Sequence, residues 1–209
     1  MKEFGTVGII GRFKPFHLGG AAMLENACKK SEKVLIGIGS CNRYNLRNPF
    51  TAYETREMIN AFLAPRFNNY EFVNVPDYGH LPQYENGKKW KEMVLKKFKE
   101  ADVFLCGNPY VINLLEDKMH VVHPASIIPR KDWVRVNATQ VRYGMALNGK
   151  WQDLVPKEVA KYIEERRLDK RLRERFGPET LQQIANASED LLNRDLSSKM
   201  EKYLVGGVK

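Results

Sequence analysis

Short apolar runs alternate with amphipathic segments along most of the chain. Short apolar runs predict strands at Gly5–Ile10, Val34–Gly39, Asp102–Cys106 and His120–His123, and alternating apolar and polar residues predict another at Tyr70–Val75. Apolar residues at helical spacing predict intervening helices at Leu18–Cys28, Met58–Leu63, Lys88–Lys99 and Tyr110–Leu115. This alternation is typical of an α/β fold, so we expect a doubly wound parallel sheet with helices on both faces.

The pattern becomes helical after the last predicted strand. Thr51–Glu54 and Asn137–Gln140 match capping boxes, in which side chains satisfy backbone N–H groups at a helix start. Pro156 is placed to begin another helix, and a charged and then amphipathic pattern follows it. We therefore divide the chain into a domain at 1–168 and a C-terminal helical extension at 169–209.

Composition narrows the class of protein. The chain has 209 residues, enough for one domain with its own core. No apolar run approaches the roughly 20 residues that cross a bilayer, and the first residues contain no signal-peptide core. We expect a cytoplasmic protein without membrane contact. Three scattered cysteines and the spacing of the histidines give no metal-ligand pattern.

The net charge of +9 indicates anionic partners of some kind. The basic runs Lys88–Lys99 and Arg166–Arg175 are compatible with nucleic-acid binding. Such runs are more often solvated helix faces, and a phosphate-rich small substrate also accounts for local basic clusters. Charge alone does not choose between these alternatives.

The turn from Gly11 to Gly20, GRFKPFHLGG, connects the first predicted strand to the first helix. Doubly wound sheets bind ligands at such turns, and a helix N-terminus favours anions. Arg12, Lys14 and His17 can all donate hydrogen bonds to phosphate oxygens. The alternative is that the glycines and Pro15 only shape a tight turn.

This turn resembles the G-R-F-x-P-F-H-x-G-H signature of archaeal-type NMN adenylyltransferases, of the nucleotidyltransferase α/β-phosphodiesterase superfamily. Four further blocks resemble that family in its own order: IGS at 38–40, NPFTA at 48–52, GNP at 107–109 and NATQVR at 137–142. The resemblance covers roughly residues 5–165 and implies a Rossmann-like nucleotidyltransferase fold.

The resemblance also implies an activity, the transfer of an adenylyl group from ATP to NMN that yields NAD and pyrophosphate. Mg²⁺ would be recruited with ATP, and homo-oligomers are common in the family. The catalytic residues it implies are His17 and Arg142. It assigns ATP binding to Gly11, Arg12, Phe13, Gly19, Gly107, Asn108, Thr139 and Arg142, and acceptor binding to Ser40, Asp77 and Trp90. Trp90 has an alternative role in the core, where tryptophans usually pack.

The chain departs from the family pattern at three places. Gly20 replaces the second histidine, Thr55 replaces an arginine that Arg56 follows, and Asn137-Ala138 replaces Ser-Gly. Loss of one charge-stabilising donor costs about 10²–10³ in rate, and the sequence offers no packing reason for glycine at position 20.

These departures leave several readings open. Activity is impaired, or a nearby cation such as Lys14, Arg43 or Arg142 replaces the lost contact. One alternative is a nucleotide-binding sensor or regulator without turnover. Another is an enzyme that acts on a different phosphorylated acceptor, such as nicotinate mononucleotide.

Overall fold

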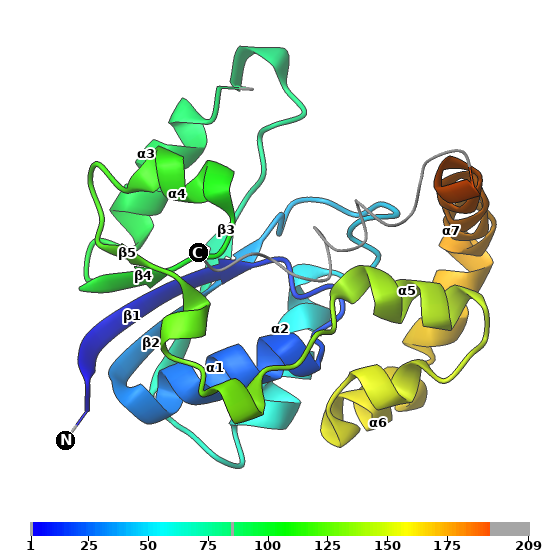
Figure 1. The fold of residues 1–209 in the computed structure, drawn as a ribbon, viewed down its shortest axis with the longest axis horizontal. Coiled ribbons are helices and arrows are strands. Elements are labelled where there is room, and N and C mark those ends of the chain that lie inside the picture. The colour runs from blue at the N-terminus through cyan, green and yellow to red at the C-terminus, as the bar shows by residue number, and fades with distance from the viewer. Residues whose placement is uncertain (1, 85, 193–209) are drawn as a thin grey trace.

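A five-stranded parallel sheet forms the centre of the molecule (Figure 1). The computed structural model describes residues 2–84 and 86–192. The strand order is β3-β2-β1-β4-β5, and the strands are β1 (Phe4–Gly11), β2 (Ser31–Gly39), β3 (Tyr70–Val75), β4 (Val103–Leu105) and β5 (Val121–Val122). The order reverses between β1 and β4, which confirms the predicted doubly wound sheet. Ligand sites in such sheets lie at the carboxyl ends of the strands beside the reversal.

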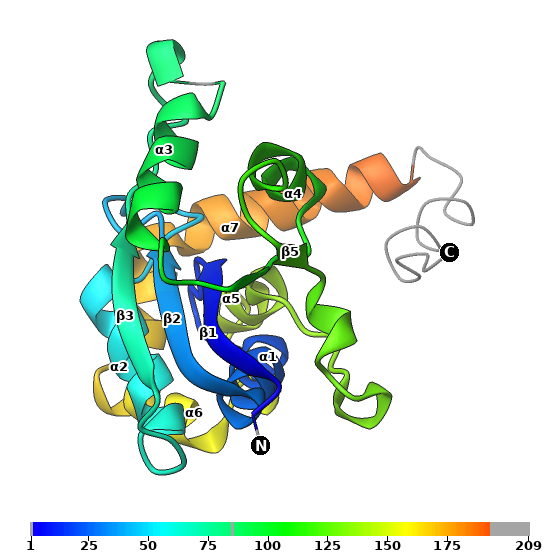
Figure 2. The ribbon, with the colours of Figure 1, turned by 90° about the vertical axis from the view of Figure 1, so that its left-hand side faces the viewer.

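Helices cover both faces of the sheet (Figure 2). They are α1 (Leu18–Lys30), α2 (Ala52–Leu63), α3 (Lys88–Lys97), α4 (Pro109–Leu115), α5 (Ala138–Ala146), α6 (Lys157–Glu165) and α7 (Leu168–Leu192). Helices α1 and α2 pack on one face, and α3 and α4 pack on the other. Helices α5, α6 and α7 lie together beside α1 and α2 (Figure 1). None of the helices in the described ranges is long and apolar enough to cross a membrane.

The two faces have separate hydrophobic cores. The larger core joins inward side chains of β1 and β2, such as Ile9 and Ile36, to α1, α2, α5 and α6. Leu168 and Leu172 of α7 belong to this same core. The smaller core packs Leu35 and Phe104 against α3 and α4. Alternation of side chains along each strand explains the arrangement, since neighbouring residues face opposite sides of a sheet.

The C-terminal extension is helical, as predicted, through residue 192, and the rest of it, 193–209, lies outside the described residues. In the sequence, Gly177-Pro178 interrupts the charged and amphipathic helical pattern. In the structure, α7 continues through these two residues with Pro178 inside it. Phe176 before the proline and Thr180 after it are both buried. Packing on both sides therefore holds the helix together although proline removes a backbone hydrogen bond. The boundary at residue 168 stays a prediction.

Candidate functional site

Two adjoining cavities open at the carboxyl end of β1, and Gly11 and Arg12 line both. The first, which we call the aromatic cavity, has a volume of about 340 Å³. Its lining includes Ser40, Asp77, Tyr84, Trp90, Asn108 and Tyr110. The second, the basic cavity, has a volume of about 470 Å³. Its lining includes Phe13, Lys14, His17, Gly19, Gly20, Arg47, Thr139 and Arg142.

Close backbone approaches shape the basic cavity. A Cβ atom at Gly11 would lie 2.6 Å from Cζ of Phe13, whose own φ is +51°. A Cβ at Gly19 would lie 2.8 Å from the carbonyl oxygen of Val136. Only glycine permits these approaches, and the second brings the start of α1 against the segment that precedes α5.

His17 caps the N-terminus of α1 from inside the basic cavity. Its Nδ1 accepts a hydrogen bond from the Gly20 backbone N–H at 3.3 Å. Burial, together with the charge of Arg142, lowers the pKa of His17 to about 4. The ring is therefore neutral near pH 7, and because Nδ1 accepts, Nε2 carries the proton. His17 offers an Nε2–H donor without a full charge.

Gly20 is more constrained than its sequence context indicates. A Cβ there would lie 3.2 Å from Cε2 of Phe16, whose side chain is fully buried, and 3.5 Å from Cδ1 of Phe13. The Phe16 ring therefore leaves limited room for a side chain, a packing constraint on position 20 that the sequence did not reveal. The Gly20 N–H donates to His17. This backbone group is therefore already engaged and is a poor substitute for an imidazole.

The N-terminus of α5 forms the opposite wall of the basic cavity. Asn137 and Gln140 make the predicted capping box, each side chain accepting from the other's backbone N–H at 3.1 and 2.8 Å. The first N–H groups of a helix have no intrahelical partner, and Ala138 and Thr139 both line the cavity. Like the start of α1, this helix start favours an anion.

Arg142 connects α5 to the glycine-rich turn. Its Nη1 donates to the Lys14 carbonyl at 3.0 Å, and its Nη2 donates to Thr139 Oγ1 at 3.0 Å. Burial and the nearby charge of Arg12 lower the pKa of Arg142 to about 10, so it stays charged at neutral pH. These contacts hold a guanidinium beside His17 in a fixed position.

The cations proposed to replace the second histidine are placed very differently. Lys14 is fully buried, and its Nζ donates to the Ser40 carbonyl at 2.8 Å, which directs it away from an incoming phosphate. Arg43 is not among the residues that line either cavity. Arg47, which the sequence reasoning missed, lines the basic cavity and is exposed. Arg47 directly precedes the NPFTA block, and this position beside a family motif is the sequence feature that could have identified it as a site residue.

The aromatic cavity contains the three predicted acceptor residues. Ser40, with φ of +50°, donates from Oγ to Asp77 Oδ2 at 3.1 Å, and the Gly79 N–H donates to Asp77 Oδ1 at 2.9 Å. Trp90 lies in the first turn of α3, lines the cavity and also packs against the smaller core. The core role considered for Trp90 therefore holds in part, and its acceptor-binding role stays a prediction.

Tyrosines that the sequence reasoning missed complete the aromatic cavity. Tyr84 and Tyr110 line it beside Trp90. The Lys89 ammonium lies 3.9 Å from the ring centroid of Tyr84 and 4.4 Å from that of Tyr78. Cations bind to the faces of aromatic rings in this way, so Lys89 holds the 78–84 segment against the start of α3.

The predicted GNP turn follows β4. Asn108 caps α4 by accepting the Tyr110 N–H at 3.0 Å, and it lines the aromatic cavity together with the acceptor residues. A Cβ at Gly107 would lie 3.2 Å from His123 Nε2, so Gly107 faces the turn after β5. The structure places Asn108 in the lining of the aromatic cavity but Gly107 in the lining of neither cavity.

Thr55 and Arg56 replace the arginine of the family pattern without entering the cavities. Thr55 is buried, and its Oγ1 donates to the Thr51 carbonyl at 2.8 Å. Arg56 donates to Asn74 Oδ1 at 2.7 Å. As its helical position predicts, Arg56 is directed toward β3 and does not line either cavity.

The fold and this pair of cavities define a nucleotidyltransferase. The chain belongs to the cytidylyltransferase-like family, whose model matches residues 9–143. Its relatives include archaeal proteins named nicotinamide-nucleotide adenylyltransferase. The protein from Methanococcus vannielii is 32% identical over 157 residues, which cover 74% of this chain and 86% of that protein. The protein from Thermococcus kodakarensis is 33% identical, with 75% and 80% covered.

Solved structures share the fold at lower identity. A bifunctional NMN adenylyltransferase/ADP ribose pyrophosphatase from Francisella tularensis, complexed with AMP and a manganese ion, is 19% identical with a TM-score of 0.62. The match covers 93% of this chain and 57% of that one. A protein from Vibrio parahaemolyticus described as a nicotinate-nucleotide adenylyltransferase is 14% identical, with a TM-score of 0.51 and 78% and 99% covered.

Proposed function

We propose that this protein transfers the adenylyl group of ATP to NMN, giving NAD and pyrophosphate. The observation that carries the proposal is the junction of the two cavities at Gly11 and Arg12. On one side lie two helix N-termini, three guanidiniums and a neutral histidine, a set suited to a polyphosphate. On the other lie Trp90 and two tyrosines, suited to a flat heterocycle.

The substrates occupy these cavities according to their chemistry. The ATP phosphates lie in the basic cavity, where His17, Thr139 and Arg142 donate to their oxygens, and the adenosine extends toward Asn108. The nicotinamide ring of NMN stacks on Trp90 in the aromatic cavity, beside Ser40 and Asp77. Arg12 stands where the NMN phosphate meets the ATP α-phosphate.

The reaction requires no covalent enzyme intermediate. An oxygen of the NMN 5′-phosphate forms a bond to the α-phosphorus of ATP while the bond from that phosphorus to the bridging oxygen of the β-phosphate breaks. The electron pair leaves with pyrophosphate. Catalysis is positioning together with stabilisation of charge on the transferring and leaving phosphates. His17 Nε2–H and the guanidiniums of Arg47 and Arg142 supply that stabilisation.

Mg²⁺ enters this site with ATP. The residues that line the basic cavity in the described part of the chain include no carboxylate, so this donor set fits phosphate oxygens. Mg²⁺ prefers oxygen ligands and is commonly bound through substrate phosphates. Bound in this way, it would neutralise charge on the leaving pyrophosphate.

A second candidate function keeps the binding site without turnover. Gly20 favours it, because the family's second histidine is missing and the Gly20 N–H is already bonded to His17. Such a protein would sense ATP or NAD. A nucleotidyltransferase with nicotinate mononucleotide as acceptor is a third candidate, since Ser40, Asp77 and Trp90 are few side chains on which to base the choice.

The direct test is NAD formation by the purified protein with ATP, NMN and Mg²⁺. We expect slow, Mg²⁺-dependent synthesis, and we expect Arg142→Met to reduce it by roughly 10²-fold, the cost of one charge-stabilising donor. Replacing NMN by nicotinate mononucleotide in the same assay tests the acceptor. Tight ATP binding without product would support the sensor, and absence of binding would end both proposals.

A further inference from the structure

Helix α7 contacts both walls of the basic cavity through neighbouring arginines. One wall is the 44–54 segment, which carries Arg47 into the cavity, and the other is α5, which carries Thr139 and Arg142. Arg171 binds the first wall and Arg173 binds the second. Residues two apart on a helix point in different directions, so one short stretch of α7 spans the two walls.

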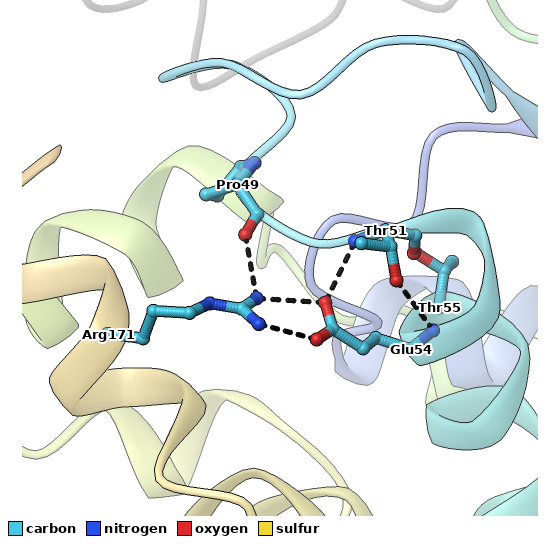
Figure 3. Close-up of polar contacts among 5 residues, drawn as sticks. All are labelled: Pro49, Thr51, Glu54, Thr55 and Arg171. Atoms are coloured by element: carbon cyan, nitrogen blue, oxygen red, sulfur yellow. Dashed lines mark hydrogen bonds and ion pairs between the residues drawn. The ribbon is translucent and has the colours of Figure 1, made fainter. Parts of the chain in front are cut away.

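Arg171 binds the first wall with both ends of its guanidinium. Nη1 and Nη2 donate to the two Glu54 carboxylate oxygens at 2.5 and 2.8 Å, and Nη2 also donates to the Pro49 carbonyl at 3.1 Å (Figure 3). The same carboxylate accepts the Thr51 backbone N–H at 2.8 Å in the capping box of α2. The guanidinium holds the pKa of Glu54 below its usual value against the opposing effect of burial. Bidentate pairs of this type fix geometry as well as charge.

Residues 44–49 form a closed loop that α7 contacts at both ends, at Tyr44 and at Pro49. Asn45 and Asn48 form an isolated antiparallel bridge, with N···O distances of 3.2 and 2.8 Å. At the start of the loop, Tyr44 packs edge-on against Phe176 of α7. The Arg175 guanidinium lies 4.9 Å from the centroid of the Tyr44 ring. Arg47 stands within this closed loop. Its backbone N–H donates to Asn45 Oδ1 at 3.1 Å, and the contacts of Tyr44 and Pro49 with α7 hold the two ends of the loop.

Arg173 binds the second wall. Its Nη1 donates to the Met145 carbonyl at 3.1 Å, near the C-terminus of α5, and its Nη2 pairs with Asp169 at 2.9 Å. Met145 lies one turn after Arg142 on the same helix, so this contact restrains the position of α5 along its helix axis. From the same stretch of α7, Arg171 therefore binds a carboxylate and a carbonyl of the first wall, and Arg173 binds a carbonyl of the second.

We propose that Arg171, through Glu54 and Pro49, is a positioning residue for ATP: it holds the 44–49 loop so that Arg47 faces the polyphosphate. Arg173 holds α5 in the matching position. Helix α7 therefore helps to position both walls of the nucleotide site. The proposal rests on the proposed function, because it assumes that ATP phosphates fill the basic cavity. It concerns ATP rather than the acceptor, since Arg47 lines the basic cavity and not the aromatic cavity.

The test compares Arg171→Met with Arg66→Met in the full-length protein. Arg66 makes a similar single-carboxylate pair, with Glu158 at 2.6 Å, between the end of α2 and α6, and lines neither cavity. Calorimetry with ATP and, separately, with NMN gives the two affinities, and thermal unfolding gives the stability of each variant. We expect Arg171→Met to raise the Kd for ATP about tenfold, equivalent to about 1.4 kcal/mol, with the Kd for NMN within about twofold.

Four outcomes decide between the possibilities. An ATP affinity of Arg171→Met equal to that of Arg66→Met would overturn the positioning role, as would equal losses for ATP and NMN. If wild-type protein itself binds no ATP, the proposed function falls and takes this inference with it. If Arg171→Met does not fold, Arg171→Lys decides: it keeps the charge but loses the fork, and we expect about a threefold loss for ATP alone. Unchanged ATP affinity in the lysine variant would overturn the inference.

Discussion

At Gly20 the N-terminal turn of α1 presents no side chain to the basic cavity, and its N–H is bonded to His17. In the proposed function, polyphosphate binding there depends on the neutral imidazole and on guanidiniums that come from other segments. Arg142 is fixed by the Lys14 carbonyl and Thr139. Arg47 is exposed and free to follow a ligand within the range that its loop permits. The positive charge at the cavity therefore comes from Arg12, Arg47 and Arg142, which lie outside the first turn of α1.

A histidine introduced at position 20 measures how much the missing side-chain donor limits the rate of NAD formation. We expect Gly20→His to raise the rate of NAD formation by up to roughly 10²-fold, because it adds a donor to the leaving phosphates. The new Cβ requires Phe16 to shift by a few tenths of an ångström, since the gap is 3.2 Å. Gly20→Ala is the matched control, because it introduces the same Cβ without a donor.

The control separates packing from chemistry. An equal gain from alanine would mean that glycine merely loosens the turn. No gain from histidine in a folded protein would favour the sensor without turnover. The assay is steady-state NAD synthesis at saturating ATP and NMN.

Lys14 gives a pH dependence of stability. Burial lowers the pKa of Lys14 from 10.5 to about 8. Between these values the unfolded chain binds more protons at this residue than the folded protein, so stability rises with pH across the window. We expect the free energy of unfolding of wild-type protein to increase relative to Lys14→Met from pH 8 to pH 10.5. Urea unfolding of both proteins at several pH values is the measurement, and parallel curves would contradict the burial of a titrating ammonium.

At the scale of elements, α7 divides into parts with different roles. Leu172 is 2% exposed within the larger core, whereas Leu181 on the same helix is 41% exposed. We expect Leu172→Ala to lower the free energy of unfolding by about 2–5 kcal/mol. Leu181→Ala should change it by less than about 0.5 kcal/mol.

Chemical denaturation followed by both fluorescence and circular dichroism checks this prediction. A single transition in every variant would mean that the start of α7 unfolds together with the sheet. A separate early transition in Leu172→Ala would instead mean that α7 unfolds independently of the sheet.

The elements nearest the sheet were the easiest to predict. Tyr70–Val75, in which apolar and polar residues alternate, matches β3, and the strands predicted from apolar runs agree within a few residues. Both capping boxes formed, since their hydrogen bonds are local. Pro178 inside α7 was not predictable, because burial of Phe176 and Thr180 on both sides of it depends on distant parts of the chain.

At the scale of the whole molecule, the ordered motifs predicted the family, which the relatives confirm. They also predicted residues that the structure brings together, such as His17 with Arg142 and Ser40 with Asp77. What they missed involves pairs separated by long stretches of sequence. Glu54 and Arg171 are 117 positions apart, and neither carries a pattern that indicates the other. Three-dimensional proximity decides such contacts.

Several residues of the two basic runs are likewise bound within the molecule. Lys91 pairs with Asp117 at 2.6 Å, Lys89 lies on two tyrosine rings, and Arg171 and Arg173 pair with Glu54 and Asp169. Charges held in this way are less available to a phosphate backbone. The contacts favour a small anionic substrate over nucleic acid.

The contacts of α7 also bear on how the protein is made. The glycine-rich turn leaves the ribosome early, whereas Arg171 and Arg173, which connect the 44–54 segment to α5, are synthesised much later. A growing chain therefore has a complete nucleotide motif but an unfinished enclosure until Arg171 and Arg173 have been made. If the protein binds ATP as proposed, its capacity to capture ATP should appear abruptly once these residues have left the ribosome, rather than increase with chain length.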